Sequence, residues 1–214
     1  MSLISMWDKQ GNLILTHDIA VIDSMPLGIT TDRKYLWVVG GENGIICQFD
    51  KQGNFISSWA MAVITDQLGD ITTDRKYLWV VDNANATVNQ YDKQGHLIFS
   101  FAATYVPAGI TTDRKYLWLT ETEAEVGTHI TQYDKQGNLI NDINIAALIP
   151  ESESWGITTD RKYLWLTDLF NTLVMQFDKQ GNLIYTWNSA VIMEFCTGIT
   201  TDRKYLWTVS FSEV

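Results

Sequence analysis

One nine-residue motif recurs five times along this chain, and the repetition constrains the fold more than any other feature. Its sequence, Ile-Thr-Thr-Asp-Arg-Lys-Tyr-Leu-Trp, begins at positions 29, 71, 110, 157 and 199. A second motif, Asp-Lys-Gln-Gly, begins at positions 8, 50, 92, 134 and 178. Repeats of this length are built as supersecondary units that bury their apolar surfaces against one another. The chain is therefore predicted to be an array of similar units.

Each unit contains four short runs of strand-forming residues separated by turn residues. In the first complete unit, the expected strands cover residues 28–31, 35–39, 45–49 and 54–59. Thr, Val, Ile, Tyr and Trp favour strands, while Asp-Arg-Lys and Asp-Lys-Gln-Gly favour turns. No helical period competes with this pattern over a useful length. Four antiparallel strands in about 42 residues are typical of one blade of a β-propeller.

The two ends of the chain supply complementary halves of one further blade. Residues 3–7 and 12–17 match the third and fourth strands of the unit, and residues 198–201 and 205–209 match the first and second. We predict an all-β fold, a five-bladed β-propeller of four-stranded antiparallel blades. The N-terminal strands pair with the C-terminal strands, which leaves no long open edge. Residues 1–214 form one domain of five repeats of about 42 residues.

The stretch from Ile71 to Gly95 resembles an NHL-type repeat and the streptogramin-lyase-like β-propellers. It reads Ile-Thr-Thr-Asp-Arg-Lys-Tyr-Leu-Trp-Val-Val-Asp-Asn-Ala-Asn-Ala-Thr-Val-Asn-Gln-Tyr-Asp-Lys-Gln-Gly, and such units cover essentially the whole chain. Three features depart from that pattern: Asp70 replaces a glycine, Arg-Lys occupies the first turn, and five blades are fewer than the usual six or more. The resemblance implies a propeller that serves as a binding platform or, less often, as an enzyme.

The loops of such a propeller fall on two faces. The turns between the first and second strands and between the third and fourth strands form one face, here called the turn face. The remaining connections form the opposite face, here called the loop face. The turns keep one length in all units, whereas the loops vary in length. We interpret the turn face as scaffold and the loop face as the surface where differences between blades are used.

Charge separates between the two faces. The chain has a net charge of -10, yet all 15 Lys and Arg residues lie in the repeated turns. Ten of the 25 acidic residues also lie in these turns, and the others fall mainly in the variable loops. The acidic balance argues against nucleic-acid partners, and no apolar run is long enough to span a membrane. The acidic loops either keep the protein soluble or attract cationic ligands and repel anions.

Aromatic residues in the variable loops suggest a ligand-binding site. An aromatic ring offers contact area at little entropic cost, and nearby carboxylates would orient the ligand. Trp155 directly precedes the glycine of a first strand and is expected near the mouth of the central channel. Each ring has the alternative role of packing over the blade. The candidate ligand-binding residues are Trp155, Tyr105, Phe195, Phe170, Asp23, Asp66, Glu151, Glu153, Glu194 and His129.

Catalytic residues are less evident in this sequence. The three histidines do not converge, because His17 is expected at an outer seam, His96 on the turn face and His129 alone on the loop face. We therefore interpret the protein as a non-enzymatic binding module for a neutral or cationic protein, peptide or glycan ligand, and expect a monomer. A glycan-binding lectin and a lyase-like enzyme using His129 are the alternatives.

Cofactors are not expected. If extended, the run Glu121-Thr122-Glu123-Ala124-Glu125 would direct three carboxylates to one side, where calcium would stabilise them. No Asp-x-Asp-x-Asp-Gly loop is present, so a solvated loop is favoured. One threonine of each Ile-Thr-Thr run could surround the axis, where bonding to its neighbours is the favoured role and a ligand bound in the channel is the alternative. Cys47 and Cys196 are interpreted as free thiols.

Overall fold

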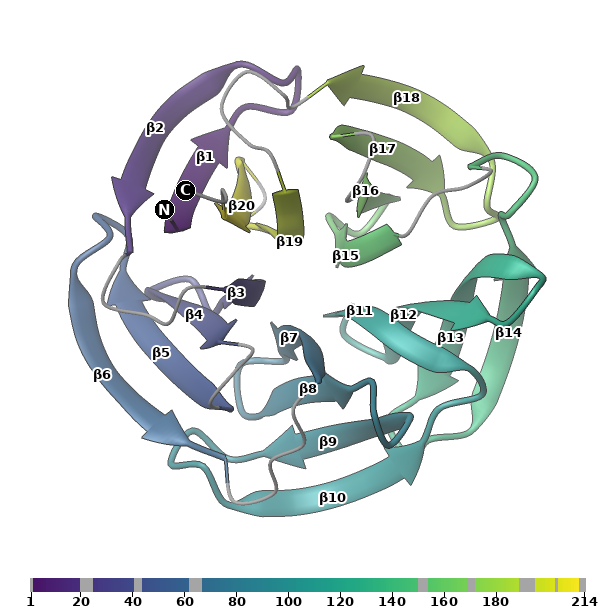
Figure 1. Ribbon diagram of the computed structural model, residues 1–214, viewed down its shortest axis with the longest axis horizontal. Coiled ribbons are helices and arrows are strands. Elements are labelled where there is room, and N and C mark those ends of the chain that lie inside the picture. Colours follow the sequence, from purple (N-terminus) through teal and green to yellow (C-terminus); the bar gives the residue numbers. More distant parts are fainter. Residues whose placement is uncertain are drawn as a thin grey trace.

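The computed structural model is a ring of five antiparallel sheets arranged as blades around a central axis (Figure 1). It describes residues 2–19, 25–40, 44–61, 67–149, 154–168, 172–188, 195–202 and 204–211. Within these residues there are 20 strands and no helix, hence no helix that could cross a membrane. The predicted all-β, five-bladed fold is confirmed.

The blades follow one another in chain order, and each begins with its innermost strand. The first complete blade consists of β3 (Pro26–Thr31), β4 (Tyr35–Gly40), β5 (Ile45–Asp50) and β6 (Phe55–Ala60). The second consists of β7 (Leu68–Thr73), β8 (Leu78–Asp82), β9 (Thr87–Tyr91) and β10 (Leu97–Ala102). The third consists of β11 (Val106–Thr112), β12 (Tyr116–Glu123), β13 (Gly127–Asp134) and β14 (Leu139–Asn144). The fourth consists of β15 (Ser154–Thr159), β16 (Tyr163–Asp168), β17 (Leu173–Asp178) and β18 (Leu183–Asn188).

The remaining blade joins the two ends of the chain. Its strand order is β19 (Phe195–Thr201), β20 (Leu206–Phe211), β1 (Ser2–Trp7) and β2 (Leu13–Asp18). Strands β20 and β1 pair antiparallel, from Phe211 opposite Ser2 to Leu206 opposite Trp7. The predicted closure is therefore confirmed, and hydrogen bonds between the chain ends hold the ring together.

Side chains of the second strands fill the space between neighbouring blades. Trp79 of β8 is completely buried and packs in one cluster with Val88 of its own blade and with Ile110 and Leu117 of the next blade. The corresponding tryptophans of the other four blades are also buried. The expectation that the second-strand tryptophans form core is confirmed.

On the turn face, one lysine from each blade contacts an aspartate of the preceding blade. Each lysine belongs to an Asp-Lys-Gln-Gly turn, and each aspartate belongs to an Asp-Arg-Lys turn. The same lysine also lies over a second-strand tryptophan; Nζ of Lys179, for example, is 4.3 Å from the ring centroid of Trp118. The ion pairs are Lys135–Asp74 (2.5 Å), Lys179–Asp113 (3.3 Å), Lys51–Asp202 (3.5 Å), Lys93–Asp32 and Lys9–Asp160. These contacts between blades give the constant turns a structural role.

These aspartates should make stability depend on pH. Burial alone would raise the pKa of Asp74, but hydrogen bonds from Lys135 and the Tyr77 amide, together with the charge of Lys135, lower it below its usual value. The pKa values of the other four aspartates are also lowered, at Asp32, Asp113, Asp160 and Asp202. A carboxyl whose pKa is lower in the folded state stabilises the fold above about pH 4, and this contribution is lost as pH falls through the folded pKa.

We therefore expect Asp74→Asn to lower the free energy of unfolding by about 1–2 kcal/mol at pH 7, a value reduced for the partial exposure of the pair. The difference between the variant and the natural protein should shrink as pH falls below about 4, because the unfolded chain then binds a proton that the native carboxylate takes up only at lower pH. Urea denaturation between pH 7 and pH 3 measures both quantities. A difference that does not change with pH would contradict this account.

Candidate functional site

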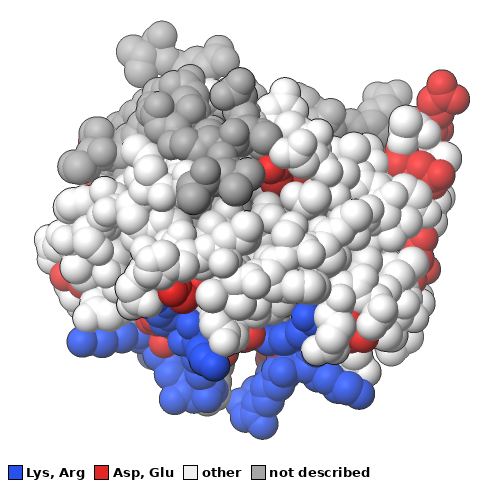
Figure 2. Space-filling model, turned by 90° about the horizontal axis from the view of Figure 1, so that it is seen from below, with Lys and Arg blue, Asp and Glu red and all other residues white. Residues whose placement is uncertain are grey.

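The basic side chains project from one face of the ring (Figure 2). This is the turn face, because every Lys and Arg of the chain belongs to the repeated turns. Four of the ten predicted ligand-binding residues, Trp155, Tyr105, Phe195 and His129, lie in the described part of the chain. The other six lie outside the described residues, namely Phe170, Asp23, Asp66, Glu151, Glu153 and Glu194.

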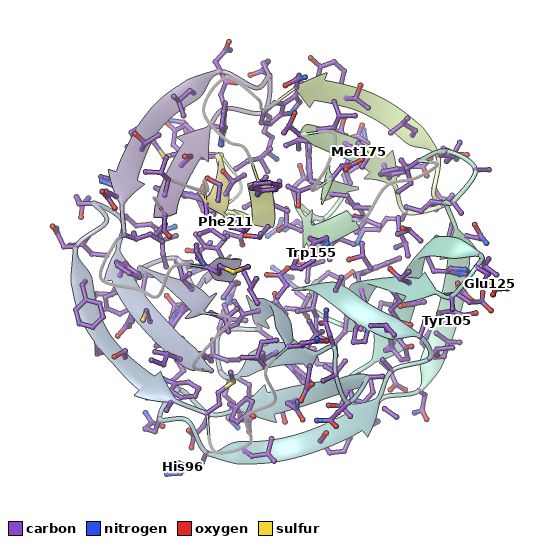
Figure 3. All side chains as sticks on the ribbon, viewed as in Figure 1. His96, Tyr105, Glu125, Trp155, Met175 and Phe211 are labelled. Atoms are coloured by element: carbon purple, nitrogen blue, oxygen red, sulfur yellow. The ribbon has the colours of Figure 1, made fainter. Side chains whose placement is uncertain are left out.

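The four described residues do not form one site. Trp155 lies close to the axis, whereas Tyr105 lies toward the rim of the third blade (Figure 3). His129 belongs with Tyr105, since their ring centroids are 4.6 Å apart. Phe195 belongs to the inner strand β19. The structure therefore divides the predicted set into an axial group and a rim group.

The axial group consists of aromatic rings at strand ends that meet the loop face. Trp155 of β15 is half-buried and packs against the cluster that contains Leu27 of β3 and Leu68 of β7. Phe195 of β19 stacks on Phe211 of β20, with ring centroids 5.1 Å apart and planes inclined by 21°. Sequence reasoning missed Phe211, although an aromatic residue at that point of a unit is unique to the last copy.

The rim group surrounds His129 on β13. Its Nδ1 lies 2.7 Å from Oδ1 of Asp142, and its Nε2 lies 3.3 Å both from Oε2 of Glu123 and from Nδ2 of Asn144. The Tyr105 hydroxyl donates to Oδ2 of Asp142 at 3.0 Å. Both imidazole nitrogens thus have partners, and the His129 side chain is 6% exposed. This cluster links strands of the third blade; Asp142 and Asn144 are exposed, and Glu123 and Tyr105 are partly exposed.

Glu121 lies beneath this cluster and is completely buried. Its Oε1 accepts hydrogen bonds of 2.9 Å from both Thr131 and Tyr133, and its Oε2 accepts one of 2.9 Å from the Tyr105 amide. Burial raises the pKa of Glu121 above its usual value, although these hydrogen bonds oppose the rise.

The expectation of a solvated loop over residues 121–125 is corrected by this arrangement, and the alternative of three carboxylates aligned on one side is not formed either. Glu121 is satisfied inside the protein, and Glu123 ends β12 beside His129. Glu125 lies in the following turn with a φ of 65°, so it does not continue the strand. Among the residues that the structure describes, no group of three or more His, Cys, Asp and Glu is arranged to hold a metal ion.

Sequence reasoning also missed Asp142 and Asn144, which complete the rim group. A signal for Asp142 was present, because the other four units carry Ser or Thr at that position: Thr16, Ser58, Ser100 and Thr186. The third blade is thus the one whose fourth strand carries a carboxylate at this position, and this carboxylate forms the contact with His129.

Among the described residues, Asp70 places a buried carboxylate at the axis. Asp70 of β7 accepts hydrogen bonds from the amide of Ile71 at 2.8 Å and from that of Ile110 at 3.3 Å. Burial raises the pKa of Asp70 well above its usual value, and amides of several inner strands partly oppose the rise. A Cβ placed at Gly28, the equivalent residue of the first blade, would lie 2.2 Å from Oδ1 of Asp70. The departure from glycine at this position therefore gives the axis its central hydrogen-bond acceptor.

The fold and these sites define a five-bladed β-propeller with aromatic rings at one end of its axis. No protein-family model matches the chain, and no curated protein matches its sequence. Its fold is similar to the solved structure of a catalytically inactive virginiamycin B lyase from Staphylococcus aureus with quinupristin, with a TM-score of 0.57 and 17% identity over 95% of this chain and 72% of that one. It is similar to a streptogramin B lyase structure with a TM-score of 0.58 and 16% identity over 97% of this chain and 66% of that one. It is also similar to the glutaminyl cyclase of Myxococcus xanthus, with a TM-score of 0.70 and 10% identity over 87% of this chain and 90% of that one.

These similarities confirm the resemblance to streptogramin-lyase-like propellers at the level of fold. The chain spans only 66% of the length of the streptogramin B lyase chain. Identities of 10–17% indicate a shared architecture and assign no activity to this chain.

The interpretation from sequence that the chain is not an enzyme is overturned by these comparisons, because the propellers that share its fold include lyases and a cyclase. That interpretation rested on three dispersed histidines. They are dispersed, since His96 is exposed at the outer rim (Figure 3) and His17 packs against Gly53. Acid-base chemistry, however, requires only one histidine oriented by a carboxylate, as His129 is by Asp142. Dispersion of the histidines is therefore no argument against catalysis.

Proposed function

We propose that this propeller binds a neutral or cationic ligand on its loop face, at the end of the axis marked by Trp155, Phe195 and Phe211. The observation that carries the proposal is the partial exposure of all three rings at strand ends on this face. Completely buried rings would be core, whereas partly exposed rings near an axis offer apolar surface to a ligand.

The distribution of charged residues supports a ligand that is neutral or cationic. Glu153 precedes Trp155 by two residues, and Glu194 immediately precedes Phe195 in the sequence. Every Lys and Arg lies in the turns, so the loop face has no basic side chain to hold an anion. Aromatic faces and carboxylates together favour an ammonium or guanidinium group, as on a basic peptide, and rings alone favour the apolar face of a sugar.

Peptide and glycan arrays, followed by titration of one retained ligand, test this proposal. Trp155→Ala should weaken binding at least about tenfold, the effect of losing one central aromatic contact. Glu153→Gln should weaken binding of a cationic ligand, and that affinity should fall as salt rises, whereas glycan affinity should change little. Mass spectrometry of the retained ligand shows whether it has been chemically altered.

Tyr185→Ala is the matched control, because Tyr185 is an exposed ring on the outermost strand β18, away from the axis. It should leave affinity unchanged. If Trp155→Ala and Tyr185→Ala bind equally well, the axial rings are not the site.

A further inference from the structure

The centre of the turn face contains a cavity of about 1080 Å³. The Asp-Arg-Lys turns and the ends of the inner strands line it, and all five blades contribute. A volume of this order accommodates a small molecule. The turn face therefore has a hollow in addition to its contacts between blades.

The two threonines of each Ile-Thr-Thr run have different roles at this cavity. The second threonine closes the turn, as Thr73 does by donating to the carbonyl of Tyr77 at 2.8 Å. The first threonine also lines the cavity, and within the described part of the chain its hydroxyl has no hydrogen-bond partner in the protein: Thr30, Thr72, Thr111, Thr158 and Thr200. The expectation that the inner threonines bond to their neighbours is therefore wrong for this ring.

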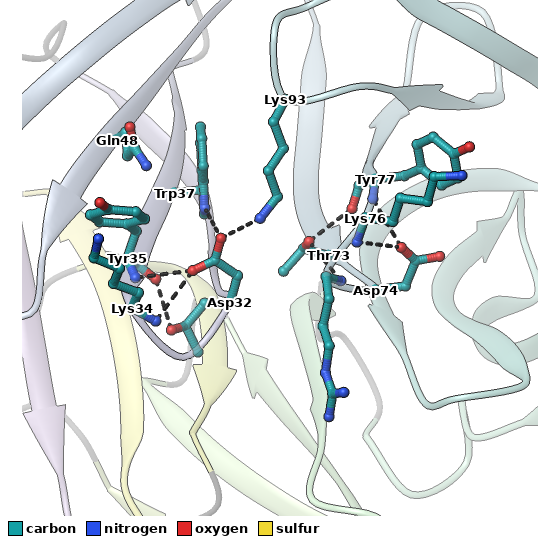
Figure 4. Close-up of polar contacts among 12 residues, drawn as sticks. Asp32, Lys34, Tyr35, Trp37, Gln48, Thr73, Asp74, Lys76, Tyr77 and Lys93 are labelled. Atoms are coloured by element: carbon teal, nitrogen blue, oxygen red, sulfur yellow. Dashed lines mark hydrogen bonds and ion pairs between the residues drawn. The ribbon is translucent and has the colours of Figure 1, made fainter.

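Arginine side chains line the same cavity without an acidic partner. Among the described residues, the guanidinium groups of Arg33, Arg75, Arg114 and Arg161 make no ion pair or hydrogen bond with the protein. The five aspartates that line the cavity are already paired with lysines, as Asp32 is with Lys93 (Figure 4). The charge left without a partner around the cavity is therefore cationic.

Three of these arginines have a backbone conformation that is unfavourable for a residue with a side chain. Arg33, Arg75 and Arg161 have φ angles of 83°, 82° and 86°, in the left-handed region. Glycine adopts this region freely, whereas an L side chain is disfavoured there. Backbone strain of this kind often occurs at functional sites, and here it recurs in three turns around one cavity.

We infer that this cavity binds a compact polyanion, a small molecule carrying several phosphate groups around a ring or along a short chain. Guanidinium groups bind phosphate oxygens in a bidentate manner, and the threonine hydroxyls donate to oxygens deeper in the cavity. The four described arginines come from four different blades, which matches a ligand whose charges are spread around an axis. A long polyanion is disfavoured, because a cavity of about 1080 Å³ holds only a short part of it.

Isothermal titration with myo-inositol hexakisphosphate and with inorganic tripolyphosphate at 0.15 M salt tests the inference. Arg75→Gly should weaken binding by about tenfold or more, the cost of one charged hydrogen-bonding contact. The same change should leave the melting temperature unchanged or raise it, because glycine relieves the backbone strain. Loss of binding without loss of stability separates a ligand contact from damage to the fold.

Two further variants refine the test. Thr72→Val keeps the shape of the threonine but removes its hydroxyl, and should weaken binding severalfold. Lys34→Gln is the control, because it removes the same charge as Arg75→Gly from the turn face while Lys34 lies over the Tyr35 ring and does not line the cavity. Its effect should stay below about twofold, since charge outside the cavity acts only through screened long-range attraction.

Failure of both probes to bind, or equal effects of Arg75→Gly and Lys34→Gln, would overturn the inference. Binding of a single-stranded 20-mer oligonucleotide as tightly as the compact probes would also overturn it. Vesicles with and without a phosphoinositide distinguish the source of the ligand: binding to soluble probes alone indicates a free phosphate compound, and binding to both indicates that a lipid headgroup is also accepted.

Discussion

Removal of residues 1–17 is expected to abolish cooperative unfolding and to cause aggregation. Strand β1 pairs with β20 on one side and with β2 on the other, so its loss exposes the edge of β20. The deletion also removes Ile4 and Trp7 from two buried clusters and breaks the ion pair of Lys9 with Asp160. Urea denaturation and light scattering measure the two effects.

A permuted chain is the control for this deletion. It begins at residue 19 and carries residues 1–18 after residue 214 through a short Gly/Ser linker, so that β20 and β1 form an ordinary hairpin. The ends of these strands are opposite each other, with Phe211 paired to Ser2. The permuted protein should unfold cooperatively. A truncated protein that stays monomeric with an unchanged melting curve would contradict the role of the closing strands.

Trp79→Ala is expected to lower the free energy of unfolding by about 3–5 kcal/mol, the usual cost of removing a large buried side chain. Trp79 is completely buried between two blades, where the cavity cannot collapse without moving both. Its indole nitrogen donates to Asp74 at 3.3 Å, and Lys135 lies 5.9 Å from its ring centroid. The change therefore removes packing between blades, a hydrogen bond within the blade and the contact with Lys135 of the next blade.

Trp155→Ala should cost distinctly less, because Trp155 is half-buried and covers one end of the axis instead of filling a space between blades. Chemical denaturation of the two variants under identical conditions compares them directly. Equal losses would show that Trp155 is core, and the proposed site on the loop face would then lose its central residue.

The fold was predictable because the repeat fixes strand length, turn position and closure together. Each unit carries the same turns, and the half-units at the two ends can complete a blade only by pairing with each other. The position of Trp155 next to the axis also followed from its place before Gly156, since the inner strand of every blade includes that position.

The polar sites were harder to predict because they depend on neighbours in space. Asp142 meets His129 across a strand pair, and a comparison of the five fourth strands would have been needed to select it. In the sequence, the Asp, Lys and Arg residues of the turns recur in every unit, so all of them were interpreted as scaffold. Only the contacts between blades show that the aspartates pair with one lysine per unit, while the four arginines that the structure describes have no acidic partner.

The single aspartate at the axis bears on how the five copies could diverge from one another. Its carboxylate accepts hydrogen bonds from the amides of Ile71 and Ile110, and the amides of Ile29 and Ile157 also stabilise it, so one copy serves at least four blades. Gly198 and Gly28 approach so closely that a Cβ on Gly198 would lie 2.8 Å from the Cα of Gly28. Five aspartates would not fit there, and five glycines would leave the amides without this acceptor. A sequence in which all five units were identical would therefore either overcrowd the axis or lose this acceptor, so four glycines and one aspartate suit the axis together.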